Sequence, residues 1–316
     1  MSGLKVFAGA AHPTLANEIC ECLGIPLGRS HTTRFSNENL KVKIEENVRE
    51  EDVFVVQTSA PPLSENIMEL LLFLDALRHA SARRVTAVLP YYPYARSDKK
   101  DEPRISIAAR LMADLLKTAG ADRVLTIDLH SPQIQGFFRT PADHLTAVPV
   151  LCEYLKREEA LDEVVVVAAD VGEAKDAARF AKYLELPMAF VDKRRTGDDE
   201  QAKPVAVIGD VVGKTALLVD DEIATGGTIF AATEFLLARG CRRVIAAVVH
   251  PVLSGRAMQR LEASALEKLI ITNTIPVPNH HSKKIVTLSV APLLATAITR
   301  IHDGRSVSEL FGSRGR

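Results

Sequence analysis

Nine short apolar runs alternate with amphipathic segments along this chain, and few folds accommodate that order. The runs are rich in β-branched residues and lack the polar alternation of a half-exposed strand: 4–9, 52–57, 84–90, 123–128, 163–169, 188–192, 215–220, 243–250 and 268–273. Such runs are typical of strands covered by helices on both faces. We therefore predict an α/β fold with parallel sheets, right-handed crossovers and ligands at the carboxyl ends of the strands.

Proline and glycine mark the ends of the predicted helices. Pro13 suits the first turn of a helix that Gly24 can end, and Gly120 and Gly240 can end two later helices. The helical segments that we predict are 12–24, 66–80, 106–121 and 227–241.

Length and charge limit the organisation and the partners. A chain of 316 residues suggests two domains of roughly 150 residues each, which we expect to join near residues 140–150. The net charge is −1, so no global field favours nucleic acid or an anionic membrane. We expect neither as a partner, and any bound anion needs a local site.

Compartment signals point to the cytoplasm. The amino-terminal segment lacks the apolar core of a signal peptide, and no run reaches the roughly 18 apolar residues of a membrane span. The four cysteines, at positions 20, 22, 152 and 241, have no zinc-site spacing. We expect a cytoplasmic protein with reduced thiols.

The segment ALLVDDEIATGGT, residues 216–228, carries the clearest chemical signal. It places Asp220 and Asp221 at the end of a buried strand and Thr225–Thr228 at the start of a helix, where unpaired N–H groups and the helix dipole favour an anion. The two acids suit the vicinal hydroxyls of a sugar. A solvated turn with an acidic lip is the alternative, but the two acids, the two threonines and the strand–helix context together favour a sugar phosphate.

Polar side chains also follow other predicted strands, and each of them allows a ligand-binding and a structural interpretation. His130 could bind a metal or a phosphate, although a lone histidine is more often structural. Asp170 is a possible outer ligand for Mg²⁺. The cations at 193–195 and Arg96 could contact a phosphoryl group or be merely solvated.

Several longer stretches resemble one family over essentially the whole chain. They are RFSNENLKVKI, NIMELLLFLDALRHASARRVTAVLPYYPYARSDKK, GADRVLTIDLHSPQIQGFF, DKRR, VDDEIATGGT, HPVLSGRAMQRL and SVSELF. In this order they resemble the ribose-phosphate diphosphokinases, also called phosphoribosyl pyrophosphate (PRPP) synthetases.

The resemblance implies a fold and a reaction. It implies two similar domains of the type I phosphoribosyltransferase fold, which we place at 1–145 and 146–296, with residues 297–316 as a candidate to complete the first. The implied enzyme is a transferase of nucleotide biosynthesis that moves the β,γ-diphosphoryl group of ATP to O1 of ribose 5-phosphate, giving AMP and PRPP. Mg²⁺ is the implied cofactor.

The resemblance also implies roles for individual residues. Lys193 and Arg195 would stabilise the transferring diphosphoryl group. Ribose 5-phosphate would be bound by Arg195, Asp220, Asp221, Ala224, Thr225, Gly226, Gly227 and Thr228. ATP would be bound by Phe35, Asn37, Glu38, Asn39, Arg96, Ser97 and His130. His130 and Asp170 would lie at the metal.

Some positions depart from the family pattern. Asn37 and Asn39 stand where acids are common, so nucleotide choice is open. Ala224 replaces the usual loop aspartate, Ser97 a glutamine and Glu173 a glycine. None of these changes removes the lysine, the arginine, the histidine or the acid pair, so we expect an active enzyme.

Two other functions remain open. A non-catalytic regulatory homologue would keep the fold while losing site residues. A phosphoribosyltransferase that consumes PRPP would explain the loop at 216–228 but not Lys193 or YYPYARSDKK.

Assembly and regulation are expected from the resemblance alone. It implies a homo-oligomer, a hexamer or smaller. It also implies an allosteric site for ADP or phosphate near Asn47, Arg49, Ser306, Ser308 and Phe311.

Overall fold

The computed structural model describes residues 3–170, 172, 174–194, 203–277 and 282–311. The chain divides into two compact units. Unit 1 comprises Met1–Thr146, Thr274–Pro276 and Ser289–Arg316, and unit 2 comprises Ala147–Asn273 and Val277–Leu288.

Unit 1 is built on a five-stranded parallel sheet with the order β1-β4-β5-β6-β7. Its strands are β1 (Leu4–Ala8), β4 (Asp52–Val56), β5 (Arg84–Leu89), β6 (Arg123–Ile127) and β7 (Ala142–Leu145). A separate antiparallel hairpin consists of β2 (Ser30–Arg34) and β3 (Leu40–Ile44). All five residues of β4 are buried, as the unalternating apolar run predicts.

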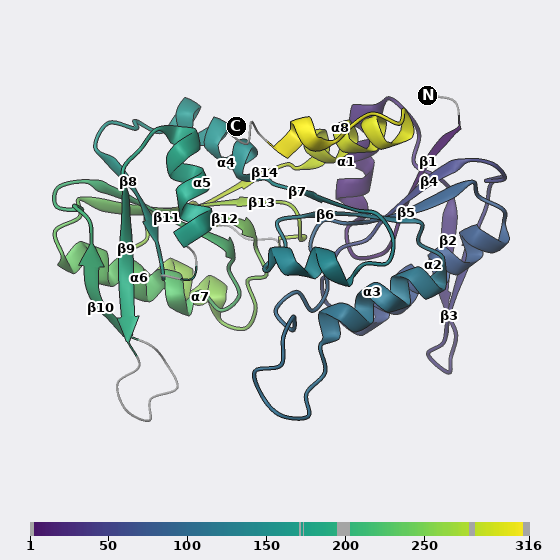
Figure 1. Cartoon of the computed structure of the whole chain (residues 1–316), viewed down its shortest axis with the longest axis horizontal. Helices are drawn as coiled ribbons and strands as arrows, with labels where there is room; N and C mark the ends of the chain where they lie inside the picture. The colour runs from purple at the N-terminus through teal and green to yellow at the C-terminus, as the bar shows by residue number, and fades with distance from the viewer. Residues whose placement is uncertain (1–2, 171, 173, 195–202, 278–281, 312–316) are drawn as a thin grey trace. The chain divides into compact units, whose positions relative to one another are not determined.

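Helices cover both faces of this sheet (Figure 1). On one side lie α1 (Pro13–Leu23) and α8 (Ala291–His302), and on the other α2 (Leu63–His79) and α3 (Ala108–Ala119). Two 3-10 turns, η1 (Pro132–Phe137) and η3 (Ser308–Phe311), complete the unit. Gly24 and Gly120 end α1 and α3 in the left-handed conformation, as predicted.

Unit 2 contains a seven-stranded sheet with the order β10-β9-β8-β11-β12-β13-β14. Its strands are β8 (Val164–Ala168), β9 (Met188–Arg194), β10 (Lys203–Ile208), β11 (Thr215–Glu222), β12 (Arg243–His250), β13 (Lys268–Thr272) and β14 (Ile285–Leu288). All pairs are parallel except β9 with the edge strand β10. The sheet is therefore mixed rather than purely parallel.

The helices of unit 2 form a layer on each face of its sheet (Figure 1). They are α4 (Val148–Glu158) and α5 (Ala174–Leu184) on one face, and α6 (Gly227–Ala238) and α7 (Ala257–Ala263) on the other. Alternate residues of β8, β11 and β12 pack under α6 and α7 in one hydrophobic core. This packing holds the start of α6 above the end of β11.

The two units repeat one order of elements. In unit 1 the order is β1, α1, hairpin β2–β3, β4, α2, β5, α3, β6, β7; in unit 2 it is β8, α5, hairpin β9–β10, β11, α6, β12, α7, β13, β14. The helix that follows each last strand belongs to the other unit, since β7 leads into α4 and β14 leads into α8. This exchange explains why the end of the chain is part of unit 1.

An ion-paired network fixes the end of α8 to the sheet of unit 1. The fully buried carboxylate of Asp52 accepts hydrogen bonds from Arg84, and its Oδ2 lies 2.9 Å from His302 Nδ1. Arg84 Nη2 also donates to the Ile301 carbonyl oxygen at 2.9 Å. Its hydrogen bond to Asp52 raises the pKa of Arg84 above the ordinary arginine value, so the guanidinium stays charged.

The four cysteines are free, and Cys20, Cys152 and Cys241 are buried. Burial raises the pKa of Cys20 to about 11 and that of Cys152 to about 12. These buried thiols therefore stay protonated and inert. Among the described residues, no helix combines the length and apolar character that a membrane crossing requires.

Candidate active site

The order of strands in unit 2 identifies where a ligand binds. β9 lies on one side of β8 in the sheet, whereas β11 lies on the other side. The direction in which successive strands are placed therefore reverses between β8 and β11. In open α/β sheets, ligands bind at such a switch point, outside the carboxyl ends of the strands. Asp170 follows β8 by two residues, and the acidic residues 220–222 end β11.

The register brings these acids to the same edge of the sheet. Val219 pairs with Ala168, so the last residues of β11 lie beside the residues that follow β8. Asp170 is half-buried, and its Oδ1 accepts the N–H of Gly172. Carboxylate oxygens from two neighbouring strands thus converge at the switch point of unit 2.

The adjacent acids of β11 point to opposite faces, because side chains alternate along a strand. Asp220 continues the side-chain row of Ala216 and Leu218, and Asp221 continues the opposite row. Asp220 is half-buried, Asp221 is 8% exposed, and Asp220 Oδ1 accepts the Asp221 N–H at 2.9 Å. The alternation explains how a buried strand can end in two acids.

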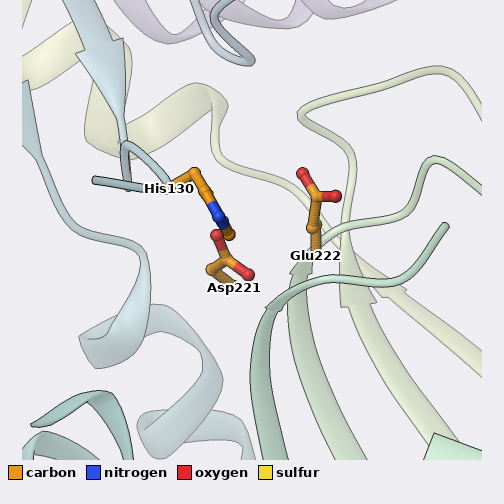
Figure 2. A group of neighbouring side chains, drawn as sticks. All are labelled: His130, Asp221 and Glu222. Carbon is orange, nitrogen blue, oxygen red and sulfur yellow. The ribbon is translucent and has the colours of Figure 1, made fainter. Parts of the chain in front are cut away.

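Glu222 is a third acid that our sequence reasoning did not assign. It is the last residue of β11 and half-buried, two residues beyond the end that the apolar run predicted. Figure 2 shows its side chain and that of Asp221 leaving the end of β11 in different directions. The three consecutive acids in the sequence were the available signal.

The segment after β11 is held by backbone hydrogen bonds to the segment after β12. The Ile223 N–H donates to the His250 carbonyl, and the carbonyls of Ile223 and Ala224 accept the N–H groups of Leu253 and Ser254. Ile223 itself is buried. The loop at 223–226 therefore has a fixed path before it enters α6.

Gly226 turns the chain into α6 with a φ of 74°. The first intrahelical hydrogen bond is donated by Phe230 to the Gly226 carbonyl. The N–H groups of residues 227–229 precede it and have no acceptor within the helix. Thr225, Gly227 and Thr228 are exposed. This arrangement of residues 225–229 can bind an anion such as a phosphate, and we call it the anion cradle.

Arg260 is a cation near this loop that our sequence reasoning missed. It lies in the last turn of α7, and its Nη1 donates to the Thr225 carbonyl oxygen at 3.4 Å. It is 35 residues from Thr225 in the chain, so only the tertiary structure reveals the contact.

The corresponding loop of unit 1 is built differently. It follows β4, and α2 begins after Pro61 and Pro62, which have no N–H to donate. Thr58 is buried and its hydroxyl donates to the Thr274 carbonyl at 2.6 Å. Unit 1 therefore lacks the glycine turn that opens α6 in unit 2.

Four of the residues predicted for ATP binding lie together on the hairpin of unit 1. Phe35, Asn37, Glu38 and Asn39 form the turn between β2 and β3, where the Phe35 N–H donates to the Asn39 carbonyl at 2.9 Å. Phe35 is 48% exposed. An exposed ring beside amides can stack on a base and hydrogen-bond to it.

The other predicted ATP residues lie in two further loops of unit 1. Arg96 and His130 are exposed, in the loops that follow β5 and β6. The Ser97 hydroxyl donates to the Ser106 carbonyl at 3.2 Å, and the Ser97 carbonyl accepts the Ala109 N–H at 3.1 Å. Ser97 thus has a structural role at the start of α3.

Of the two predicted catalytic residues, only the backbone of Lys193 is described. Lys193 lies near the end of β9 and pairs with Pro204 of β10. Arg195 lies outside the described residues. β9 is the neighbour of β8, so its carboxyl end belongs to the switch-point edge of unit 2.

The residues predicted for an allosteric site are all in unit 1. Asn47 Oδ1 accepts the Arg49 N–H at 3.1 Å, and the hydroxyls of Ser306 and Ser308 are 2.7 Å apart. Phe311 ends η3. These local hydrogen bonds shape two turns and identify no ligand.

Comparison with known proteins agrees with this arrangement. A family model described as the N-terminal domain of ribose phosphate pyrophosphokinase matches residues 4–120, and one described as the phosphoribosyl synthetase-associated domain matches residues 197–312. The ribose-phosphate pyrophosphokinase of Deinococcus radiodurans is 50% identical over 315 residues, covering 98% of each chain. The chain belongs to the ribose-phosphate pyrophosphokinase family.

Other members of the ribose-phosphate pyrophosphokinase family support the same conclusion. The protein from Bacillus caldolyticus is 48% identical over 309 residues, covering 98% of each chain. The phosphoribosylpyrophosphate synthetase of Mycobacterium smegmatis has a solved structure that matches with a TM-score of 0.90 and 43% identity over 96% of this chain and 100% of that one. The predicted fold class is thereby confirmed.

Proposed function

We propose that this protein transfers the β,γ-diphosphoryl group of ATP to O1 of ribose 5-phosphate, giving AMP and PRPP. The observation that carries the proposal is the anion cradle at the switch point of unit 2, with carboxylates beside it, in a chain of the ribose-phosphate pyrophosphokinase family. A cradle next to paired acids suits a phosphate joined to a polyol.

Ribose 5-phosphate binds along the loop between β11 and α6. Asp220 and Asp221 accept hydrogen bonds from the vicinal hydroxyls of the sugar. The 5-phosphate accepts hydrogen bonds from backbone N–H groups and hydroxyls of the segment 224–228, where Ala224 contributes backbone only. Arg195 adds a cation to the same substrate.

ATP binds to residues of unit 1. The exposed ring of Phe35 packs on adenine, and Asn37, Glu38 and Asn39 of the same turn bind polar groups of the nucleotide. Amides donate hydrogen bonds as well as accept them, so Asn37 and Asn39 can bind acceptor groups of the nucleotide that ionised acids could not bind. Arg96, Ser97 and His130 are the remaining ATP residues of the proposal.

A divalent cation, Mg²⁺, is the proposed cofactor. The carboxylates of Asp170, Asp220, Asp221 and Glu222 are hard oxygen donors at one edge of unit 2, which fits the ligand preference of Mg²⁺. Asp170 and His130 are the residues that we assign to it. When bound, the cation neutralises charge on the phosphates of ATP.

The transfer requires positioning and charge neutralisation rather than a protein nucleophile. The O1 oxygen of the sugar forms a bond to the β phosphorus, the bond from that phosphorus to the α,β-bridging oxygen breaks, and the electron pair leaves with AMP. The hydroxyl proton of O1 is released. Lys193 and Arg195 stabilise the negative charge on the transferring group.

Three further assignments belong to the proposal. The residues Asn47, Arg49, Ser306, Ser308 and Phe311 bind the effectors ADP or phosphate. The protein is a homo-oligomer, a hexamer or smaller. It works in the cytoplasm, which its four free thiols support.

The test is product analysis of the purified protein with ATP, Mg²⁺ and ribose 5-phosphate. We expect AMP that depends on the sugar phosphate, together with an equal amount of PRPP. We expect Lys193→Ala to lower kcat by a few orders of magnitude with a nearly unchanged KM, because it removes transition-state charge. Lys182→Ala, at an exposed position on α5, is the matched control.

The two alternative functions give other results in the same assay. Folded protein that releases no AMP would overturn the proposal and favour a regulatory homologue. Consumption of added PRPP together with a nucleobase, without AMP formation from ATP, would favour a phosphoribosyltransferase. An unchanged kcat in Lys193→Ala would remove the assigned role of that lysine.

A further inference from the structure

Arg260 projects from α7 toward the first turn of α6. Its Nη1 lies 3.4 Å from the Thr225 carbonyl oxygen, and a Cβ built on Gly227 would lie 3.9 Å from the same nitrogen. Gly227 and Thr228 are exposed at this turn. The guanidinium therefore borders the surface that the free N–H groups of α6 face.

The contact to Thr225 uses little of the hydrogen-bonding capacity of Arg260. A guanidinium carries five N–H donors in a planar fork that matches a phosphate. Within the described part of the chain, the Thr225 carbonyl is the one hydrogen-bond partner of the Arg260 side chain. The side chain is exposed, so its other donors are available to a ligand.

The helix that carries Arg260 is fixed on both sides. Before it, the Ser254 N–H donates to the Ala224 carbonyl, which ties α7 to the loop after β11. After it, the Lys284 ammonium donates to the carbonyls of Leu261 and Ser264 at 3.0 and 2.7 Å. Ala257 and Leu261 are buried beneath the helix. Arg260 is thus a pre-positioned cation.

The charge around the cradle favours such a cation. Three carboxylates, at positions 220–222, end the strand that leads into the loop. A phosphate monoester carries about two negative charges at neutral pH, whereas a helix amino terminus supplies only about half a positive charge. A cation beside the first turn of α6 therefore reduces the repulsion between the phosphate and these carboxylates.

We infer that Arg260 binds the 5-phosphate of ribose 5-phosphate across the first turn of α6. This inference rests on the proposed function, because it takes the ligand of the cradle to be that sugar phosphate. Arg260 sets the preference of the site for a phosphorylated sugar, and it does not act on the diphosphoryl group of ATP.

The test compares Arg260→Gln and Arg260→Lys with Arg157→Gln, which removes an exposed arginine of α4. Binding of ribose 5-phosphate and of unphosphorylated ribose to the full-length protein is measured by calorimetry, and kcat and KM are measured where turnover is present. We expect Arg260→Gln to weaken ribose 5-phosphate binding about 10- to 100-fold, because a charge-assisted hydrogen bond is lost. Ribose binding, kcat and the KM for ATP should not change.

The conservative variant and the control distinguish a lost phosphate contact from a disturbed loop. Arg260→Lys should recover part of the affinity, and Arg157→Gln should match the wild type. If Arg260→Gln binds ribose 5-phosphate as the wild type does, or loses ribose equally, the inference is overturned. A wild-type protein that binds the sugar phosphate but forms no PRPP would overturn the proposed function and leave this inference standing.

Discussion

Gly226 shows how one residue shapes the cradle. It combines a φ of 74° with a neighbour that leaves no room for a side chain, since a Cβ would lie 2.1 Å from Phe230 Cε2. The left-handed conformation alone costs a non-glycine residue roughly 1–2 kcal/mol. The ring of Phe230, which is buried in the core under α6, would also have to move.

We expect Gly226→Ala to lower the free energy of unfolding by roughly 2–4 kcal/mol, from backbone strain and overpacking together. It should also weaken binding of ribose 5-phosphate, because the N–H groups of the first turn shift. Chemical denaturation and calorimetry measure the two effects.

Gly213→Ala is the matched control for this prediction. Gly213 has a φ of 71°, but no atom lies within 4 Å of the place that a Cβ would take, so only the backbone strain applies. We expect a loss of roughly 1 kcal/mol and unchanged binding. Equal losses in the two variants would contradict the role of Phe230.

At the residue scale, the sequence predicted what neighbours in the chain can encode. The acid pair and the glycine-rich turn are contiguous, so the pattern at 216–228 indicated a sugar-phosphate loop before any fold was known. Glu222 was missed because the apolar run ends earlier than β11 does. Arg260 was missed because its proximity to Thr225 depends on how α7 packs.

At the element scale, an ion network ties α4 to the amino-terminal ends of β12 and β13. Glu159, whose side chain is 4% exposed, accepts hydrogen bonds from Arg243 and from Lys268. Burial alone would raise the pKa of the Glu159 carboxyl, but the hydrogen bonds from Lys268 and Arg243 outweigh it and hold the pKa below the ordinary glutamate value.

The lowered pKa predicts a pH dependence. A carboxyl whose pKa is lower in the folded state stabilises the fold above its ordinary pKa of 4.5, and that contribution is lost as the pH falls through the folded-state value. We expect Glu159→Gln to lower the free energy of unfolding at pH 7 by roughly 2 kcal/mol and to flatten its decline below about pH 4.5. Urea unfolding at a series of pH values measures both.

Glu163→Gln is the control for the network. Glu163 pairs with Arg242 at 3.3 Å, but its side chain is 68% exposed, and exposed pairs contribute little. Its pH profile should follow the wild type. A Glu159→Gln profile that also runs parallel to the wild type would mean that the network carries no pH-dependent stability.

The strands that were predicted from sequence carry continuous apolar runs, and most of them are buried on both faces. All nine apolar runs became strands, since parallel strands under two helix layers need mostly apolar residues. β2 and β3 alternate in exposure, β7 and β14 have four residues each, and β10 contains Pro204, so none of them has that signature. The order of strands, and hence the switch point, depends on tertiary packing.

At the scale of the whole molecule, the two units have the same order of elements but differ in one equivalent loop. That loop follows β11 in unit 2 and β4 in unit 1. The unit 2 loop has Gly226 and Gly227 at the start of α6, whereas the unit 1 loop has two prolines before α2. The glycine turn of unit 2 is the one that we assign to the sugar phosphate. Unit 1 carries the exposed hairpin turn with Phe35.

The most direct measurement is an amide NMR titration of the full chain with ribose 5-phosphate, with ribose as the control. We expect the amide protons of Gly226, Gly227 and Thr228 to shift downfield on adding the sugar phosphate and not on adding ribose, because those N–H groups donate to the phosphate. Saturation of the protein with these three amides unmoved, and with the largest shifts elsewhere, would contradict the assignment of the cradle.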